Sequence, residues 1–159
     1  MRDLLAFPDD SRVWIYQANQ PIPESEIGMV NAQVSAFAKE WVSHNRALHA
    51  TGGLLHDVFL VLVADESQAG ASGCSIDASV RFIRGIGEQY QRDFFDRLQF
   101  AFLDQGTVRF IHRDALPEAY QSGLINDETL FFDNLVKTKR DFINHWLTPF
   151  GHSWLKRFI

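Results

Sequence analysis

The run VFLVLVAD, from Val58 to Asp65, is the most continuous apolar stretch of the chain. Its β-branched and aromatic residues favour a strand, and apolar side chains fall on both of the faces that alternate along a strand. Such a strand needs cover on both sides, which a sheet inside an α+β domain supplies. We therefore expect Val58–Asp65 to be the central strand of the sheet.

The segments before this strand predict one more strand and one helix. RVWIYQA, Arg12–Ala18, is β-branched and aromatic, which favours a strand. The acids around Pro23 favour a helix start, and we expect this helix to end near Asn45. Its apolar stripe is Ile27, Val30, Val34, Phe37 and Trp41, with His44 next on the same stripe. Arg46–Asp57 contains the breaker Gly52-Gly53 and is predicted to be a connection.

A second helix and a hairpin are predicted after the central strand. The helix follows the small-residue loop ESQAGASGCS, with Ser75 as its N-cap and Asp77 in its first turn. Its predicted buried stripe is Ile76, Val80, Ile83, Gly87 and Tyr90. The following run RLQFAFLDQGTVRFIHR reads as two strands joined by the turn Asp104-Gln105-Gly106.

The last third of the chain is predicted to be helical. A short helix in LPEAYQSG stops at Gly123, a long helical region over residues 126–150 is ended by Pro149, and the tail after it docks on the body. The element order is β-α-β-α-β-β-α-α. We expect one α+β domain, residues 1–159, with a mixed sheet of about four strands covered by helices. Parallel neighbours, if present, would be joined by right-handed crossovers.

Composition excludes several classes of function. The net charge of −5 argues against nucleic acid as the partner, because phosphate binding needs clustered cations. One cysteine excludes an internal disulfide and a cysteine-cluster metal site, and the six histidines show no metal-ligand spacing. No signal peptide and no membrane-spanning run are recognisable. We expect a soluble cytoplasmic protein without metal or cofactor, which binds a small molecule or a protein partner.

Cys74, the only cysteine, lies in the turn SGCSID before the second helix. A thiol at a helix N-terminus is activated by the helix dipole, and the amides that follow it could stabilise an oxyanion. His44 is the candidate base. Asp77 opposes this hypothesis, since a carboxylate in the same turn repels a thiolate. The alternative is that Cys74 is a small buried residue in a tight connection.

Two further features bear on function. The loop AGASGCS follows a strand as a Walker A loop does, but it lacks the G-K-[ST] ending, so the chain is not predicted to be an ATPase. Tryptophan and tyrosine are typical of binding sites. A ligand site near the Ser72–Asp77 turn would use the following side chains: Trp14, Tyr16, Trp41, Ser75, Asp77 and Trp154.

Five segments together resemble a known family: SRVWIYQ, W..H...L, ASGCSIDASVRFI, FDNLV and SWLKRF. The chain resembles a family of small Bacteroidetes proteins of about this length, whose members often carry the label "ABC transporter ATPase". The resemblance covers nearly the whole chain and implies no catalytic residues.

The leading hypothesis from the sequence is a binding domain with its site at the Ser72–Asp77 turn. A cysteine-dependent hydrolase or transferase, with Cys74 as nucleophile and His44 as base, is one alternative. A structural or dimerising domain that uses the exposed side of the hairpin is the other.

Overall fold

The computed structural model describes all residues from 1 to 159. Its strands are β1 (Arg12–Gln17), β2 (Val42–Ser43), β3 (Arg46–Ala47), β4 (His49–Leu55), β5 (Phe59–Asp65), β6 (Gln99–Asp104), β7 (Thr107–His112), β8 (Leu130–Phe132) and β9 (Leu147–Pro149). Its α-helices are α1 (Glu24–Glu40), α2 (Gly73–Tyr90), α3 (Leu116–Gln121) and α4 (Lys139–His145). Four 3-10 helices complete it: η1 (Leu4–Ala6), η2 (Arg113–Ala115), η3 (Phe150–His152) and η4 (Trp154–Phe158). The α+β class is confirmed.

The predicted central strand is β5, which lies between β1 and β4 in a three-stranded sheet. Six of its seven residues are buried, as an apolar strand covered on both faces requires. Its pairing with β1 and β4 is antiparallel. No pair of strands in the protein is parallel, so the mixed sheet is corrected to three antiparallel sheets, and no right-handed crossover arises.

The predicted connection Arg46–Asp57 is instead a strand for most of its length, because β4 pairs along the whole of β5. Gly52 in β4 does not break this strand. A Cβ on Gly52 would lie 2.8 Å from Leu62 Cδ2 and 2.9 Å from the Val61 carbonyl oxygen. The glycine is therefore needed for close packing in the sheet rather than for a turn.

The first helix ends earlier than predicted. α1 stops at Glu40, and Trp41 already has extended backbone. His44 and Asn45 have φ of 50° and 62°, which makes them the two-residue turn between the short strands β2 and β3. The helical stripe holds for Val30 and Val34, which are fully buried. His44 is not on that stripe: it is an exposed turn residue.

The second large sheet has the order β7-β6-β8-β9. The predicted hairpin of β6 and β7 is confirmed, and its turn residues Gln105 and Gly106 have positive φ, as a two-residue hairpin loop requires. The long helix predicted over residues 126–150 is wrong. This region holds β8, the short helix α4 with Thr138 as its N-cap, and β9. The region contains strands because β8 pairs with β6. Helical spacing in the sequence does not reveal this long-range pairing.

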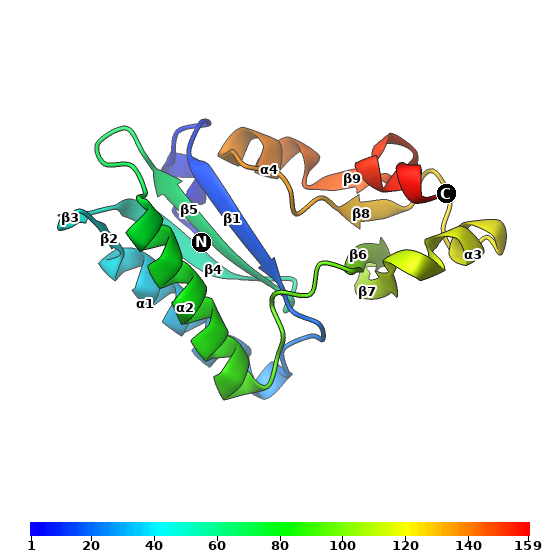
Figure 1. Ribbon diagram of the computed structural model, residues 1–159, viewed down its shortest axis with the longest axis horizontal. Coiled ribbons are helices and arrows are strands. Elements are labelled where there is room, and N and C mark those ends of the chain that lie inside the picture. The colour runs from blue at the N-terminus through cyan, green and yellow to red at the C-terminus, as the bar shows by residue number, and fades with distance from the viewer.

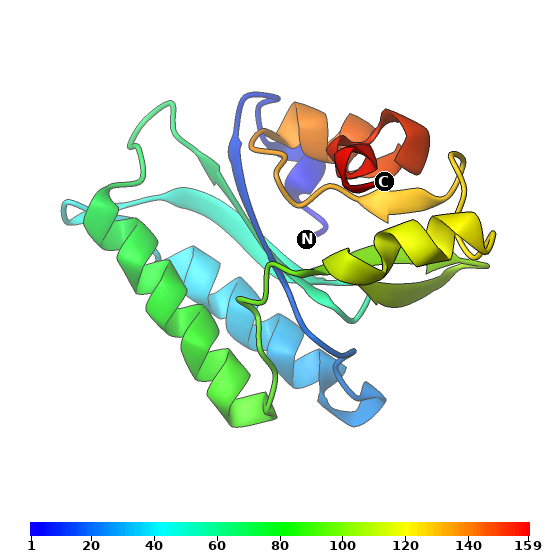
Figure 2. The same ribbon diagram turned by 45° about the vertical axis from the view of Figure 1, so that its right-hand side comes forward.

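The two sheets and the helices form layers (Figures 1 and 2). α1 and α2 lie side by side on one face of the β1-β5-β4 sheet and enclose a core of 14 buried residues. The opposite face of this sheet packs against the second sheet and α4 through ten more buried residues. A third core of eight buried residues lies between the far face of the second sheet, α3 and the C-terminal 3-10 helices. None of the helices has the length and apolarity that crossing a bilayer requires.

The C-terminal tail docks on the body, as predicted, through η3 and η4. Phe150 and Leu155 are buried in the third core. The Lys156 ammonium donates to the Tyr120 hydroxyl at 2.8 Å and to the Asp127 carboxylate. This bond holds the pKa of Asp127 below its ordinary value and raises the pKa of Lys156. Because both groups are exposed, the pair orients the tail more than it stabilises the fold.

Candidate functional site

The Ser72–Asp77 turn begins α2, but its cap differs from the prediction. Ser72, not Ser75, is the N-cap: its hydroxyl accepts from the Ser75 amide at 3.2 Å. The Ser75 hydroxyl accepts in turn from the Ser72 amide at 2.7 Å, which completes a capping box. Cys74 is the second residue of the helix and is exposed, and Asp77 is exposed in the following turn.

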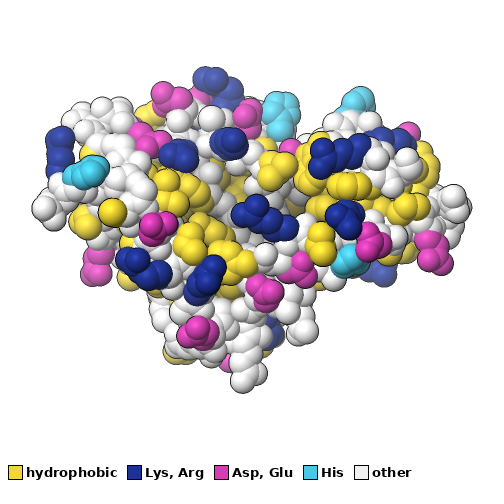
Figure 3. Space-filling view, viewed as in Figure 1, with side chains coloured by type: hydrophobic (Ala, Val, Ile, Leu, Met, Phe, Trp, Pro, Cys, Tyr) yellow, Lys and Arg dark blue, Asp and Glu magenta, His cyan; other side chains and the backbone are white.

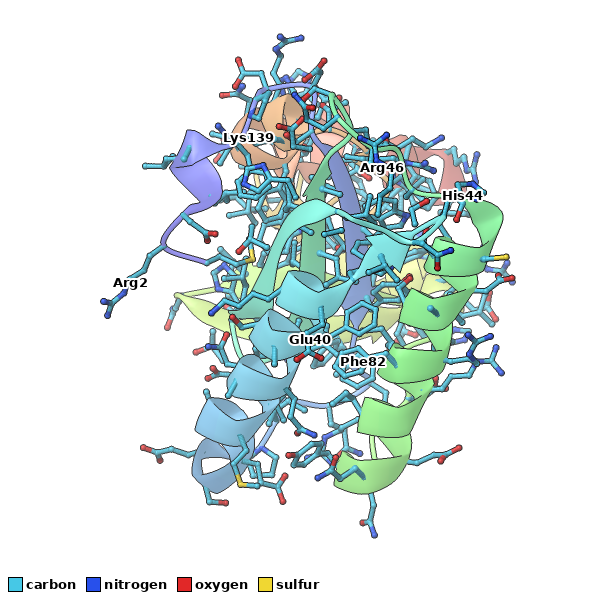
Figure 4. All side chains as sticks on the ribbon, turned by 90° about the vertical axis from the view of Figure 1, so that its left-hand side faces the viewer. Arg2, Glu40, His44, Arg46, Phe82 and Lys139 are labelled. Atoms are coloured by element: carbon cyan, nitrogen blue, oxygen red, sulfur yellow. The ribbon has the colours of Figure 1, made fainter.

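The proposed base does not engage the cysteine. Figure 4 shows His44 beside the N-terminal end of α2, on the β2–β3 ribbon that contacts this helix. No hydrogen bond joins Cys74 to any histidine in the structure. The cavities of about 420 Å³ beside Arg84 and about 200 Å³ beside Lys39 are not lined by Cys74. Catalysis by Cys74 with His44 as base remains a prediction, and the geometry that supports a site lies elsewhere on α2.

The exposure of Cys74 leads to a direct prediction. Iodoacetamide should label the folded protein at a rate within about tenfold of the urea-unfolded chain, because no packing shields the sulfur. Intact mass measured over time gives both rates, and a single adduct is expected since the chain has one cysteine. Labelling that begins only on unfolding would show that Cys74 is a packing residue.

Two aromatic residues of β1 form the centre of the best-supported site. Trp14 and Tyr16 lie on the face of β1 that α1 and α2 cover, and both are only partly buried there. Arg12 lies two residues before Trp14 on the same face, and its guanidinium carbon is 4.9 Å from the centre of the Trp14 ring. A strand places every second side chain on one face, which explains this alignment.

The row of side chains continues from β1 to the segment after α2. The Phe95 ring lies edge-on to Tyr16, with 5.8 Å between ring centres. The Arg84 guanidinium carbon is 5.0 Å from the centre of the Phe95 ring. Arg12, Trp14, Tyr16, Phe95 and Arg84 thus form a line of three aromatic rings with an arginine at each end, which we call the arginine–aromatic row.

Tyr16, the central member of this row, is a neutral group whose pKa is raised further by burial. Desolvation raises the pKa of the Tyr16 hydroxyl, and a hydrogen bond with Ser79 lowers it by a smaller amount. Tyr16 therefore stays protonated at neutral pH and does not repel an anion that approaches the two arginines.

A cavity of about 420 Å³ opens at the Arg84 end of the row. It lies between the C-terminal half of α2 and the segment 91–95, and Phe95 contributes to its wall. Gly87 is one of the lining residues, and the absence of a side chain there lets the backbone of Arg92 pack against α2. The cavity is an open groove, which suits a segment lying along the surface better than an enclosed small molecule.

The arginines of the row are available to a ligand. Only Arg12 has a carboxylate partner, Glu66, at the long distance of 3.9 Å. Arg84 is exposed and forms no ion pair. A guanidinium stacked on an aromatic ring keeps its N–H edge free and is already oriented to bind a carboxylate or phosphate with two hydrogen bonds.

The other predicted ligand residues have different surroundings. Trp41 and Ser75 are buried, and the Trp41 indole donates to the Ser75 carbonyl at 2.8 Å, so both hold α2 in place. Trp41 and Trp14 pack edge to face, with 5.2 Å between the ring centres. Trp154 lies in η4, far along the chain, where its indole donates to Asp133 at 3.2 Å.

The five segments that carry the family resemblance are joined in pairs by hydrogen bonds. Trp41 binds the segment that contains Ser75, Asn134 donates to the Gln17 side chain at 2.9 Å, and Trp154 binds Asp133. These bonds connect elements that are distant in sequence. The segments therefore hold the layers together, and among their residues only Arg12, Trp14 and Tyr16 belong to the arginine–aromatic row.

Comparisons with protein-family models, with curated proteins and with solved structures find no match. The family resemblance therefore stays a prediction.

Three residues of the row were missed from the sequence. Arg12 could have been found, since R-V-W-I-Y places Arg12, Trp14 and Tyr16 on one face of a strand. Arg84 and Phe95 carry no such signal, because only the return of the chain after α2 brings Phe95 to Tyr16.

Proposed function

We propose that this protein is a protein-interaction domain that binds an acidic segment of a partner along the arginine–aromatic row. The observation that carries the proposal is the row itself: Trp14 and Tyr16 share one face of β1, Tyr16 lies edge-on to Phe95, and an arginine lies over the ring at each end. The site lies on the β1 side of α2, and its Trp14 end is near the start of this helix, because Trp14 packs on Trp41 and the Trp41 indole donates to the Ser75 carbonyl.

Surface composition supports this choice of ligand. Figure 3 shows Lys and Arg side chains over α2 and over β1, with hydrophobic side chains between them and Asp and Glu side chains interspersed. The arginines at the two ends of the row are the groups that would attract an acidic segment to a chain whose whole charge is −5. Aromatic residues and arginine are the side chains that most often dominate binding energy at protein interfaces.

Length indicates the size of the bound segment. From Arg12 to Tyr16 the strand rises about 3.3 Å per residue, and the Phe95 and Arg84 contacts extend the row to about 20 Å. An extended peptide of about six residues covers this length. Acidic residues at its two ends would meet the arginines, and apolar residues between them would lie on the rings.

The test uses a fluorescein-labelled peptide, Glu-Phe-Glu-Asp-Phe-Glu, and fluorescence anisotropy. The folded protein should bind it, and Arg84→Gln should weaken binding about fivefold, the loss expected for one exposed charged contact. Arg46→Gln is the matched control, because Arg46 is an exposed arginine on β3 with no aromatic ring beneath it. Added salt should weaken binding to the wild-type protein.

Two results would overturn the proposal. One is the absence of binding, or equal weakening by Arg84→Gln and Arg46→Gln. The other is tighter binding of a single-stranded oligothymidylate that displaces the peptide, since stacking of bases on the rings would then be the function of the row.

A further inference from the structure

We propose that the binding surface continues from the arginine–aromatic row onto the C-terminal 3-10 helix η4, so that the partner segment is extended and its acidic residues reach both places. This inference rests on the proposed function. It assigns a second subsite, centred on Arg157, that takes a carboxylate of the same segment.

A second group of stacked arginines and rings lies at η4. The Arg157 guanidinium carbon is 4.9 Å from the centre of the Trp154 ring and 5.0 Å from the centre of the Phe158 ring. Phe100 of β6 packs edge-on to Trp154, with 5.7 Å between the ring centres. All three rings are partly buried and partly open to solvent. The arrangement thus repeats the one at Arg12 and Arg84, with one guanidinium over two rings.

Arg157 is the available cation of this group. Arg113 lies near Phe158, at 6.0 Å from its ring centre, but it is paired with Asp114 at 3.1 Å. Arg157 is exposed and has no carboxylate partner in the protein. Its free N–H edge is therefore the group that an acidic side chain of a ligand would meet.

A side-chain bond joins the two groups across the sheets. Gln17 follows Tyr16 on β1, and its amide donates to the carbonyl of Gln99, the neighbour of Phe100, at 3.1 Å. Asn134 donates to the other end of the same Gln17 side chain at 2.9 Å. Gln17 faces the second sheet, on the side of β1 opposite to the row, so these bonds fix β1 against β6 and thereby fix the row relative to the η4 group. In Figure 3, hydrophobic side chains and cations extend over β1 and over the C-terminal part of the same face.

The proposal predicts that peptide length matters. A peptide of about six residues covers the row only, whereas one of about twelve residues extends about 40 Å and reaches beyond it. The two probes are the peptide Glu-Phe-Glu-Asp-Phe-Glu and the same sequence written twice, both labelled with fluorescein. The long probe should bind at least about tenfold more tightly, because its second half binds without a new loss of translational freedom.

The variant Arg157→Gln separates this inference from the proposed function. It should weaken the long probe about fivefold and leave the short probe unchanged, whereas Arg84→Gln should weaken both. Arg46→Gln should change neither. Circular dichroism spectra of the variants should match the wild type, since Arg84, Arg157 and Arg46 are all exposed.

Three outcomes decide between the two proposals. If both probes bind equally and Arg157→Gln has no effect on either, the second subsite does not exist while the proposed function stands. If neither probe binds, the proposed function fails and the inference fails with it. If Arg157→Gln weakens the short probe as much as the long one, the short peptide also occupies η4, and the assignment of Arg157 to a second subsite is overturned.

Discussion

Replacing Gly87 with alanine should lower the free energy of unfolding by about 2–3 kcal/mol, because the new methyl group overpacks a backbone contact. A Cβ at this position lies 2.5 Å from the Arg92 carbonyl oxygen. The chain cannot withdraw easily, since the Arg92 amide donates to the Gly87 carbonyl at 2.8 Å and closes the end of α2. Urea unfolding followed by circular dichroism measures the change.

Gly85→Ala is the matched control in the same helix. A Cβ on Gly85 meets no atom within 4 Å, so alanine there should raise stability by about 0.5–1 kcal/mol through its better helix propensity. Gly87→Ala should also weaken peptide binding, because it displaces the segment that carries Phe95. Equal stability of the two variants would show that segment 91–95 does not lie as close to α2 as the structure indicates.

Replacing Phe59 with alanine should have a still larger effect, about 3–5 kcal/mol, the usual loss for a large aromatic residue in a core. Phe59 of β5 is fully buried. Its ring centre lies 4.6 Å from that of Phe132 on β8 and 4.9 Å from that of Trp146 after α4. The residue therefore packs the first sheet against the second.

The same variant tests whether residues 1–159 unfold as one unit. If they do, tryptophan fluorescence and far-ultraviolet circular dichroism should report one coincident transition in both the wild type and Phe59→Ala. Leu5→Ala is the control: its side chain is 80% exposed, and the change should stay within about 0.5 kcal/mol. Two separated transitions would mean that the second sheet unfolds independently and that the single-domain prediction is wrong.

The packing of α1 on the sheet and against α2 shows which contacts helical periodicity predicts. Val30 and Val34 were predicted to face the core and are fully buried there. Phe37, also on the predicted stripe, stacks on Phe82 of α2 at 4.4 Å, and Figure 4 shows Phe82 between the two helices. At Trp41 the periodicity no longer predicts the backbone structure, because the chain has left the helix although the Trp41 side chain is still buried.

The residues predicted for the candidate site also lie in different parts of the structure. Trp14 and Tyr16 were expected to line a ligand site, and they form the centre of the proposed row. Cys74 attracted attention as the only thiol, yet it is an exposed residue without a hydrogen-bonded base. Trp154 was placed with the first group from sequence, whereas it lies at the separate η4 group.

Local sequence determined the elements whose stability depends on near neighbours: the apolar strand β5, the hairpin turn at Gln105-Gly106, and part of the buried faces of α1 and α2. These follow from side-chain alternation, backbone φ preference and helical spacing, which act over a few residues. On α2, Ile83, Gly87 and Tyr90 are buried as predicted, whereas Ile76 and Val80 are only partly buried and Ser75, Ser79 and Ile86 are buried instead. Tertiary structure alone decided that Gly52 lies within a strand, that β8 and β9 replace a helix, and that Arg84 and Phe95 complete the row begun by Arg12. Each of these depends on contacts between segments distant in the chain, and such contacts outweigh local preference when they bury apolar surface or satisfy backbone hydrogen bonds.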